Sequence, residues 1–317
     1  MHLHIFLILL SIFSVLESNE LAFITNQESN KLDIIDLNKK IKIKEIDVGL
    51  KPAAILVDQK TQMIFVSNPE SNNISVINWL KDSNILINSG KSPMGLAFDR
   101  NKNILFVSNW YDSSVTVLDL ISKKKIKIIS VGASPAGLYF DEATKHLFVA
   151  NREDGNLSII NTDTFELISN VNVGSAPFGI YSENYLDYIV VTNVQSNSIS
   201  IVNKINFKII KNIDVGKWPY SSIHDKVKNH LYVTNQRDDS ISVIDMNKNK
   251  KLSTINDVCE YPEGIDISYS LNLIVVACWF QDNIILIDLN NFNNKTSITT
   301  SGGPRAFGKF ILNTNHE

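Results

Sequence analysis

The chain has 317 residues, 44% of them apolar, which is enough for a large buried core. Its formal net charge of −3 gives no reason to expect nucleic acid or an acidic membrane as a partner, because both are bound through clustered Lys and Arg. The length fits either two ordinary domains or one large repetitive domain.

The first 18 residues are predicted to form an export signal. Residues 5–16 are apolar except for Ser11 and Ser14, which matches a signal-peptide core and is too short to span a bilayer. No Lys or Arg precedes this run, and a buried N-terminal strand is the alternative. No later apolar run is long enough for a membrane helix. Residues 19–317 are therefore expected to form a single domain that acts in the periplasm or outside the cell.

From residue 21 onward, a short apolar phrase recurs seven times. The first six copies end in Asn at intervals of 42, 41, 42, 42 and 42 residues, and the seventh, VVAC, ends in Cys278 after 43 more. The asparagines are Asn26, Asn68, Asn109, Asn151, Asn193 and Asn235. Seven prolines keep the same spacing, namely Pro52, Pro93, Pro135, Pro177, Pro219, Pro262 and Pro304. A period near 42 with short β-type runs is typical of propeller blades.

One repeat, residues 135–173, illustrates the unit. It contains four strand-like runs separated by turn residues: PAGLYFD, HLFVAN, NLSIIN and FELISNVNV. Four short strands joined by hairpins make an antiparallel meander, and the apolar residues on both faces require a neighbouring sheet on each side. The sequence therefore predicts an all-β fold, a seven-bladed β-propeller with four-stranded antiparallel blades.

The two ends of the repeat region predict how the ring closes. After the export signal the chain begins with LAFITN, a second strand, and it finishes with GPRAFGKFIL, a first strand. Seven complete blades exist only if these two segments share one sheet. We therefore expect the N- and C-terminal strands to close the ring within one blade.

The phrases LYVTN at 231–235 and ISVID at 241–245 resemble the YVTN-type β-propeller repeat family. The repeat of that family reads approximately V-G-x-x-P-x-G, then Y-V-T-N, then V-S-V-I-D, and the similarity covers essentially everything after residue 20. The resemblance implies the same seven-bladed fold. Its members include exported binding proteins, surface proteins and some enzymes, so it does not specify a function.

Residues that recur in every blade are expected to be structural. The repeat Asn and Pro belong to this class, as do the glycines three positions before the proline, which are expected to supply turns with positive φ. These glycines are Gly49, Gly90, Gly132, Gly174 and Gly216.

Candidate functional residues are those that vary beside the repeat Pro and just after the repeat Asn. In a meander these two turns lie on one face of the disc, which we call the top face. Three of the four Trp and three of the four Arg fall there, and both residue types are enriched in binding hot spots. The alternative is that the aromatic rings pack under long side chains and only seal the blades. The predicted ligand-binding residues are Trp110, Tyr111, Arg152, Phe178, Trp218, Tyr220, Arg237, Glu263, Trp279 and Arg305.

The two cysteines occupy matched positions of one repeat. Cys259 replaces the repeat glycine and Cys278 the repeat asparagine, and they are 19 residues apart, as are Gly and Asn in five other repeats. We expect a disulfide, in keeping with an oxidising compartment. Two independent buried thiols are the alternative. Metal ligation is less favoured because no His is near in register and two thiolates do not complete a zinc site.

The sequence contains no C-x-x-C-H, H-E-x-x-H, G-x-S-x-G or Gly-rich phosphate loop, so no cofactor is expected. The preferred function is a monomeric binding or scaffold protein, without catalysis, that recognises a protein, peptide or anionic ligand. The alternative is a metal-dependent hydrolase or lyase at the channel mouth, where Glu263 and Glu153 with Asn151 and Asn235 would hold Ca²⁺. Single-strand nucleic-acid binding is a weaker idea that the acidic net charge disfavours.

Overall fold

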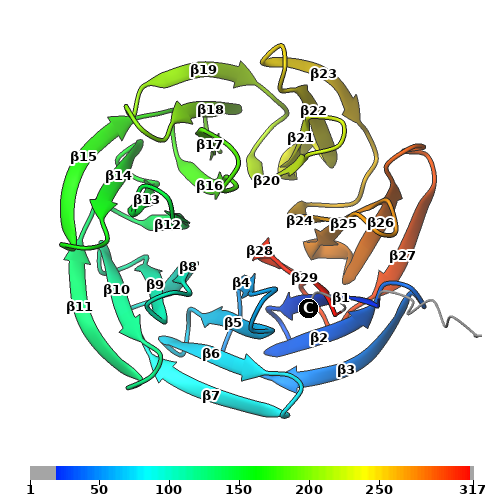
Figure 1. Ribbon diagram of the computed structural model, residues 1–317. Coiled ribbons are helices and arrows are strands. Elements are labelled where there is room, and N and C mark those ends of the chain that lie inside the picture. Colours follow the sequence, from blue (N-terminus) through cyan, green and yellow to red (C-terminus); the bar gives the residue numbers. More distant parts are fainter. Residues whose placement is uncertain (1–18, 315–317) are drawn as a thin grey trace, which may run out of the picture.

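The computed structural model describes residues 19–314, and the predicted export signal at 1–18 lies outside the described residues. Within the described part, the strands form seven sheets arranged in a ring around a central channel (Figure 1). The prediction of an all-β, seven-bladed propeller is confirmed. None of the helices in residues 19–314 has the length and apolar character needed to cross a bilayer.

Each blade has the same four strand positions. Six inner strands begin at or just after a repeat proline: β4 (Ala54–Val57), β8 (Pro93–Asp99), β12 (Pro135–Asp141), β16 (Pro177–Tyr181), β20 (Pro219–Asp225) and β24 (Pro262–Ser268). Second strands end at the repeat Asn or at Cys278: β1 (Glu20–Asn26), β5 (Met63–Asn68), β9 (Ile104–Asn109), β13 (His146–Asn151), β17 (Tyr188–Asn193), β21 (His230–Asn235) and β25 (Leu273–Cys278).

Third strands end in Asp or Asn: β2 (Lys31–Asp36), β6 (Asn73–Asn78), β10 (Ser114–Asp119), β14 (Asn156–Asn161), β18 (Ser198–Asn203), β22 (Ser240–Asp245) and β26 (Asn283–Asp288). Outer strands form the rim: β3 (Ile41–Asp47), β7 (Ser83–Asn88), β11 (Lys124–Ser130), β15 (Glu166–Asn172), β19 (Ile209–Asp214), β23 (Lys250–Ile255) and β27 (Lys295–Thr299). Two single-turn 3₁₀ helices, η1 (Gln236–Asp238) and η2 (Trp279–Gln281), follow the second strands of two blades.

The repeat asparagine is a buried hydrogen-bonding clamp. Asn109 Oδ1 accepts the N–H of Gly90 at 3.0 Å, and its Nδ2 donates to Thr116 Oγ1 at 2.8 Å. Asn109 thereby links the turn before the first strand of its blade to the third strand of the same blade. Asn193 and Asn235 make the corresponding bonds, so a structural role for this position is confirmed.

The prediction that the repeat glycines supply positive φ is wrong. None of them has a positive φ, which occurs instead at the residue before the proline, for example at Trp218 with φ 55°. Glycine is needed because the clamp approaches so closely: a Cβ on Gly90 would lie 2.4 Å from Asn109 Cγ. Sequence spacing located the turn correctly but could not reveal that a side chain from the neighbouring strand fills the space.

The ring closes within one blade, as predicted, although the closing segment is divided. β29 (Ile311–Asn313) pairs antiparallel with β1, and Pro304 bridges Asn26. Between these points β28 (Phe307–Lys309) bulges inward and pairs parallel with β4 of the next blade. Figure 1 shows β28 reaching into the central opening. The closing segment therefore joins two blades and narrows the channel.

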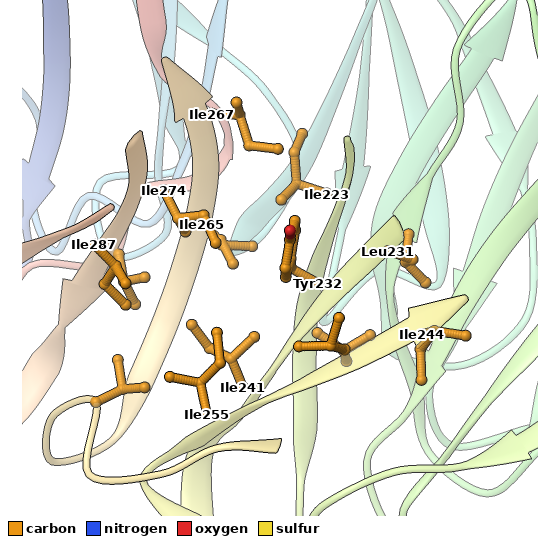
Figure 2. Packing of buried hydrophobic residues seen from close by; sticks show 14 of the residues in the cluster. Ile223, Leu231, Tyr232, Ile241, Ile244, Ile255, Ile265, Ile267, Ile274 and Ile287 are labelled. Atoms are coloured by element: carbon orange, nitrogen blue, oxygen red, sulfur yellow. The ribbon is translucent and has the colours of Figure 1, made fainter. Parts of the chain in front are cut away.

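Apolar side chains between neighbouring blades form the core. Figure 2 shows one such layer, in which Ile223 and Tyr232 of one blade face Ile265 and Ile274 of the next. Tyr232 and Ile274 are fully buried. Burying a large apolar side chain contributes roughly 1.5–3 kcal/mol, and because the layer recurs between blades, packing holds the inner strands and their top-face turns in fixed positions.

Candidate functional site

The turns of the top face share a backbone conformation that recurs from blade to blade. Trp218 and Tyr261, each just before a repeat proline, adopt left-handed φ values of 55° and 58°. The N–H of Trp218 is bound by Asn197 Oδ1 at 3.1 Å, and that of Tyr261 by Asp239 Oδ1 at 3.0 Å. The left-handed conformation costs a non-glycine residue about 1–2 kcal/mol, and these bonds from the preceding blade help to offset it. The aromatic side chains of Trp218, which belongs to the predicted set, and of Tyr261 therefore start from fixed backbone positions.

Three Arg–Trp pairs lie around the top face. The guanidinium carbon of Arg237 lies 3.6 Å from the ring centre of Trp218. The corresponding distance is 5.9 Å for Arg152 and Trp110, and 5.5 Å for Arg305 and Trp279. A cation over an indole face contributes about 0.5–1 kcal/mol at exposed sites. All six residues belong to the predicted set, and the structure brings them together in pairs.

Arg305 belongs to a buried polar network as well. Its Nε donates to Glu263 Oε2 at 2.7 Å, and its Nη2 donates to Glu263 Oε1 at 3.2 Å and to Tyr220 Oη at 2.6 Å. Gln236 Nε2 donates to the same Glu263 Oε1 at 3.0 Å. This network joins residues from three blades.

Burial and the contact between Glu263 and Arg305 act in opposite directions on the pKa values of this network. Glu263 is 1% exposed, and burial raises the pKa of its carboxyl group, while Arg305 acts in the opposite direction. Burial would lower the pKa of Arg305, but Glu263 and Tyr220 reverse this and raise it. A guanidinium stays charged in proteins, so Arg305 is a cation held in direct contact with the Glu263 carboxyl group. Glu263 thus compensates most of the positive charge that the sequence suggested for a ligand.

Phe178 and Tyr220 are more buried than a binding surface would require. They are 5% and 4% exposed, and their rings stack with centres 4.5 Å apart. Phe307 from β28 packs against both, at 5.0 and 5.4 Å. These three rings, which we call the aromatic plug, lie under the top face. Phe178 and Tyr220 therefore fit the alternative given above, in which aromatic rings seal the blades, better than a role as an exposed binding surface.

A second aromatic group is exposed beside the cysteines. Trp279 stacks on Phe280 with centres 4.8 Å apart, and Tyr261 packs against both rings. Phe280 is 61% exposed. The disulfide predicted between Cys259 and Cys278 is confirmed, with the two Cα atoms 5.8 Å apart. The disulfide anchors the end of β25, and η2, which follows directly, carries the rings of Trp279 and Phe280.

The top face also contains an open hollow of about 710 Å³. Trp110 and Tyr111 line it, and Tyr111 is 76% exposed. Two lysines, Lys51 and Lys91, line the hollow together with one acidic residue, Glu70, and with Arg305, whose charge is already compensated by Glu263. This lining favours a ligand with an apolar part and a negative charge.

The predicted ligand-binding set leaves out two residues of this region. Gln236 supports Glu263, and Phe307 completes the aromatic plug. Gln236 immediately follows a repeat asparagine, and Phe307 lies three positions after the last repeat proline, so their places in the repeat were a signal for both. Their burial depends on contacts between different blades.

The alternative metal site is not supported by this geometry. Both oxygens of Glu263 accept hydrogen bonds, while Glu153 is an exposed side chain paired with Arg152. Within residues 19–314, no three His, Cys, Asp or Glu side chains gather closely enough to hold a metal ion.

No protein-family model matches the chain, and no curated protein matches it in sequence. Solved structures are similar in fold. Hydrazine synthase from Kuenenia stuttgartiensis has 16% identity and a TM-score of 0.73, and the match covers 88% of this chain and 92% of that one. A functionally unknown protein from Desulfotomaculum acetoxidans DSM 771 has 9% identity and a TM-score of 0.79, covering 93% and 99%. AztD from Citrobacter koseri has 13% identity and a TM-score of 0.65, covering 95% and 99%. At these identities the similarity establishes the propeller fold alone.

Proposed function

We propose that the chain is an exported β-propeller of the YVTN repeat type that binds a protein partner on its top face. The partner segment would carry acidic and apolar side chains. The proposal is supported above all by two Trp–Arg pairs on the top face. The Trp110 ring of one pair lines an open hollow that also contains two lysines and one acidic residue. Trp and Arg are the residues most enriched in binding hot spots, and Arg pairs well with carboxylates. The disulfide and the apolar segment at 5–16 support export.

The double variant Arg152→Ala/Arg237→Ala tests this surface. Both side chains lie at the surface and contact Trp rings, so we expect the melting temperature to change little. Partner binding should weaken at least about thirty-fold, because a hot-spot truncation costs about 2 kcal/mol or more. The matched control is Lys226→Ala, which removes a cation 4.8 Å from the ring centre of Tyr269, outside the proposed surface.

The partner can be found by site-specific photo-crosslinking in an extract of the cell envelope. A photoreactive phenylalanine at Tyr111 samples the hollow, and the same group at Tyr185, 58% exposed and outside it, is the control. We expect mass spectrometry to identify one partner that is captured from the first position and not the second. Capture should disappear in the double Arg variant. Equal capture by the double variant, or from both positions, would remove the top face as the binding surface.

A further inference from the structure

The central channel contains a second cavity, of about 320 Å³, which the proposed function does not use. Each blade contributes to its wall the residue three positions after its repeat proline. Six of these seven residues are apolar and one is a serine: Ile55, Leu96, Leu138, Ile180, Ser222, Ile265 and Phe307. This apolar ring suits the apolar body of a small molecule, and the polar residues elsewhere in the wall can orient it.

The aromatic plug separates this channel cavity from the top face. Phe178 and Tyr220 stand at the top-face ends of β16 and β20, and the next residues along those strands, such as Ile180 and Ser221, line the cavity. Phe307 completes the plug and lines the cavity as well. A ligand therefore enters from the opposite face and does not compete with the top-face partner.

Charged residues line the end of the cavity that lies opposite the aromatic plug. Lys309 of β28 forms an ion pair with Glu183, which follows β16, so this bridge links blades that are not neighbours. Both side chains line the cavity and are partly exposed. Arg100 is paired with Asp58 in the same lining. Because each of these four charges has a partner, an ionic ligand would have to break an existing ion pair, and an uncharged ligand would not.

Strand β20 differs from the other inner strands in carrying two adjacent serines, Ser221 and Ser222, in the cavity lining. At the position of Ser221 the other blades carry Gly or Ala, and at that of Ser222 they carry Ile, Leu or Phe. Both serines line the cavity and are 7% exposed. Within the described residues the buried Oγ of Ser222 has no hydrogen-bond partner, whereas Ser221 bonds to Thr234 through its backbone N–H and carbonyl groups. A buried hydroxyl group normally has a partner, and a serine can reorient its Oγ by rotation about χ1.

We propose that the channel cavity binds a small uncharged molecule with an apolar body and a hydroxyl group that bonds to Ser222. The apolar wall accommodates the body, and β20 orients it. Gly308 of β28 has φ +128°, and a Cβ there would lie 2.1 Å from the Ile55 carbonyl oxygen. The bulge that supplies Phe307 and Lys309 to the cavity therefore requires glycine at this point.

Benzyl alcohol, toluene, benzoate and benzylamine form a matched set of probes, because they share one ring and differ in polar group and charge. Ligand-observed NMR with the full chain should detect benzyl alcohol, more weakly toluene, and neither ion. The Arg152→Ala/Arg237→Ala variant should bind benzyl alcohol as the wild type does, because those residues lie beyond the plug. Binding of benzoate or benzylamine as strong as that of benzyl alcohol, or no binding of benzyl alcohol, would overturn the proposal.

Two substitutions localise the site. Ser222→Ala should weaken benzyl alcohol about five-fold, the effect of one lost hydrogen bond, and leave toluene unchanged. Ser222→Leu installs an aliphatic residue of the kind found in other blades and should exclude both probes by filling the cavity. Benzyl alcohol binding that is unchanged in both variants would place the probe elsewhere and refute the site. The alanine variant keeps the test valid if the leucine variant does not fold.

Discussion

Asp266 is a buried carboxylate that holds the closing segment. It is 7% exposed, and its Oδ2 accepts the N–H groups of Phe310 at 2.9 Å and Ile311 at 3.0 Å. Burial raises the pKa of Asp266 from 3.8 to about 6, against the effect of these bonds and of Lys309. The folded state thus binds this proton more tightly than the unfolded state does.

This shift predicts a pH dependence of stability. The favourable contribution of Asp266 is fully present below pH 3.8 and is lost as the pH rises through about 6. The free energy of unfolding of the wild type minus that of Asp266→Asn should therefore fall by about 2 kcal/mol between pH 4 and pH 7. Urea denaturation at several pH values measures it.

Asp141 provides a control of opposite sign. Burial acts to raise the pKa of Asp141, but the hydrogen bonds from Lys204 and Thr144 outweigh burial and lower that pKa. The corresponding difference for Asp141→Asn should therefore rise with pH, as the stabilising ionised form replaces the protonated one. Parallel pH profiles for the wild type and Asp266→Asn would contradict the assignment of a raised pKa to Asp266.

At the scale of the element, strand β26 of the blade that contains the cysteines departs from the repeat as well. In the other blades the residue seven positions after the repeat Asn is Asp, Ser or Thr, and in most blades its hydroxyl group accepts a bond from the clamp. In the cysteine blade this position is Ile285, which is buried. Asn283, which aligns with the clamp partner Asn156, has a buried Oδ1 without a hydrogen-bond partner. The disulfide has replaced both the clamp and its need for a hydroxyl.

This replacement predicts a coupling between positions. Cys259→Gly/Cys278→Asn should lower the free energy of unfolding by about 3 kcal/mol through loss of the disulfide. Ile285→Ser should lower the free energy of unfolding by at least about 1 kcal/mol less in this double variant than in the wild type. The reason is that the side chain of the new asparagine at position 278 can donate a hydrogen bond to the new serine hydroxyl group. Chemical denaturation of the four proteins gives the coupling energy.

Ile287→Ser is the control for this cycle. Ile287 is a buried residue of the same strand that does not align with a clamp partner, so its effect should be additive within about 0.5 kcal/mol. Equal costs of Ile285→Ser in both backgrounds would mean that the hydroxyl and the clamp are not linked.

At the scale of the whole molecule, ring closure depends on the last strands. β28 and β29 bury Phe307, Phe310, Ile311 and Leu312 against two blades. At roughly 1.5–3 kcal/mol for each large apolar side chain, these four contribute about as much as the total stability of a typical domain, 5–15 kcal/mol.

Deleting residues 306–317 should therefore open the ring and replace a sharp thermal transition by a broad one at lower temperature. Differential scanning calorimetry measures both features. Deleting only residues 315–317 should leave the transition unchanged. If the longer truncation melted as sharply as the full chain, the ring would not depend on its closing strands.

The sequence by itself determined the blade number, the strand order, the shared closing blade and the disulfide. These follow from a period of about 42 residues and from matched spacings such as that between Cys259 and Cys278, which are local patterns. It also selected the top-face residues, because a meander places the turns beside Pro and after Asn on one face.

Only the tertiary structure decided which of those residues are buried and what they contact. Glu263 and Tyr220 have no local signal for burial, since their partner Arg305 comes from another blade. The inward bulge of β28 likewise depends on β4, some 250 residues earlier. The physical reason is that a repeat fixes each blade separately, whereas the channel and its plug form where the inner ends of all the blades meet.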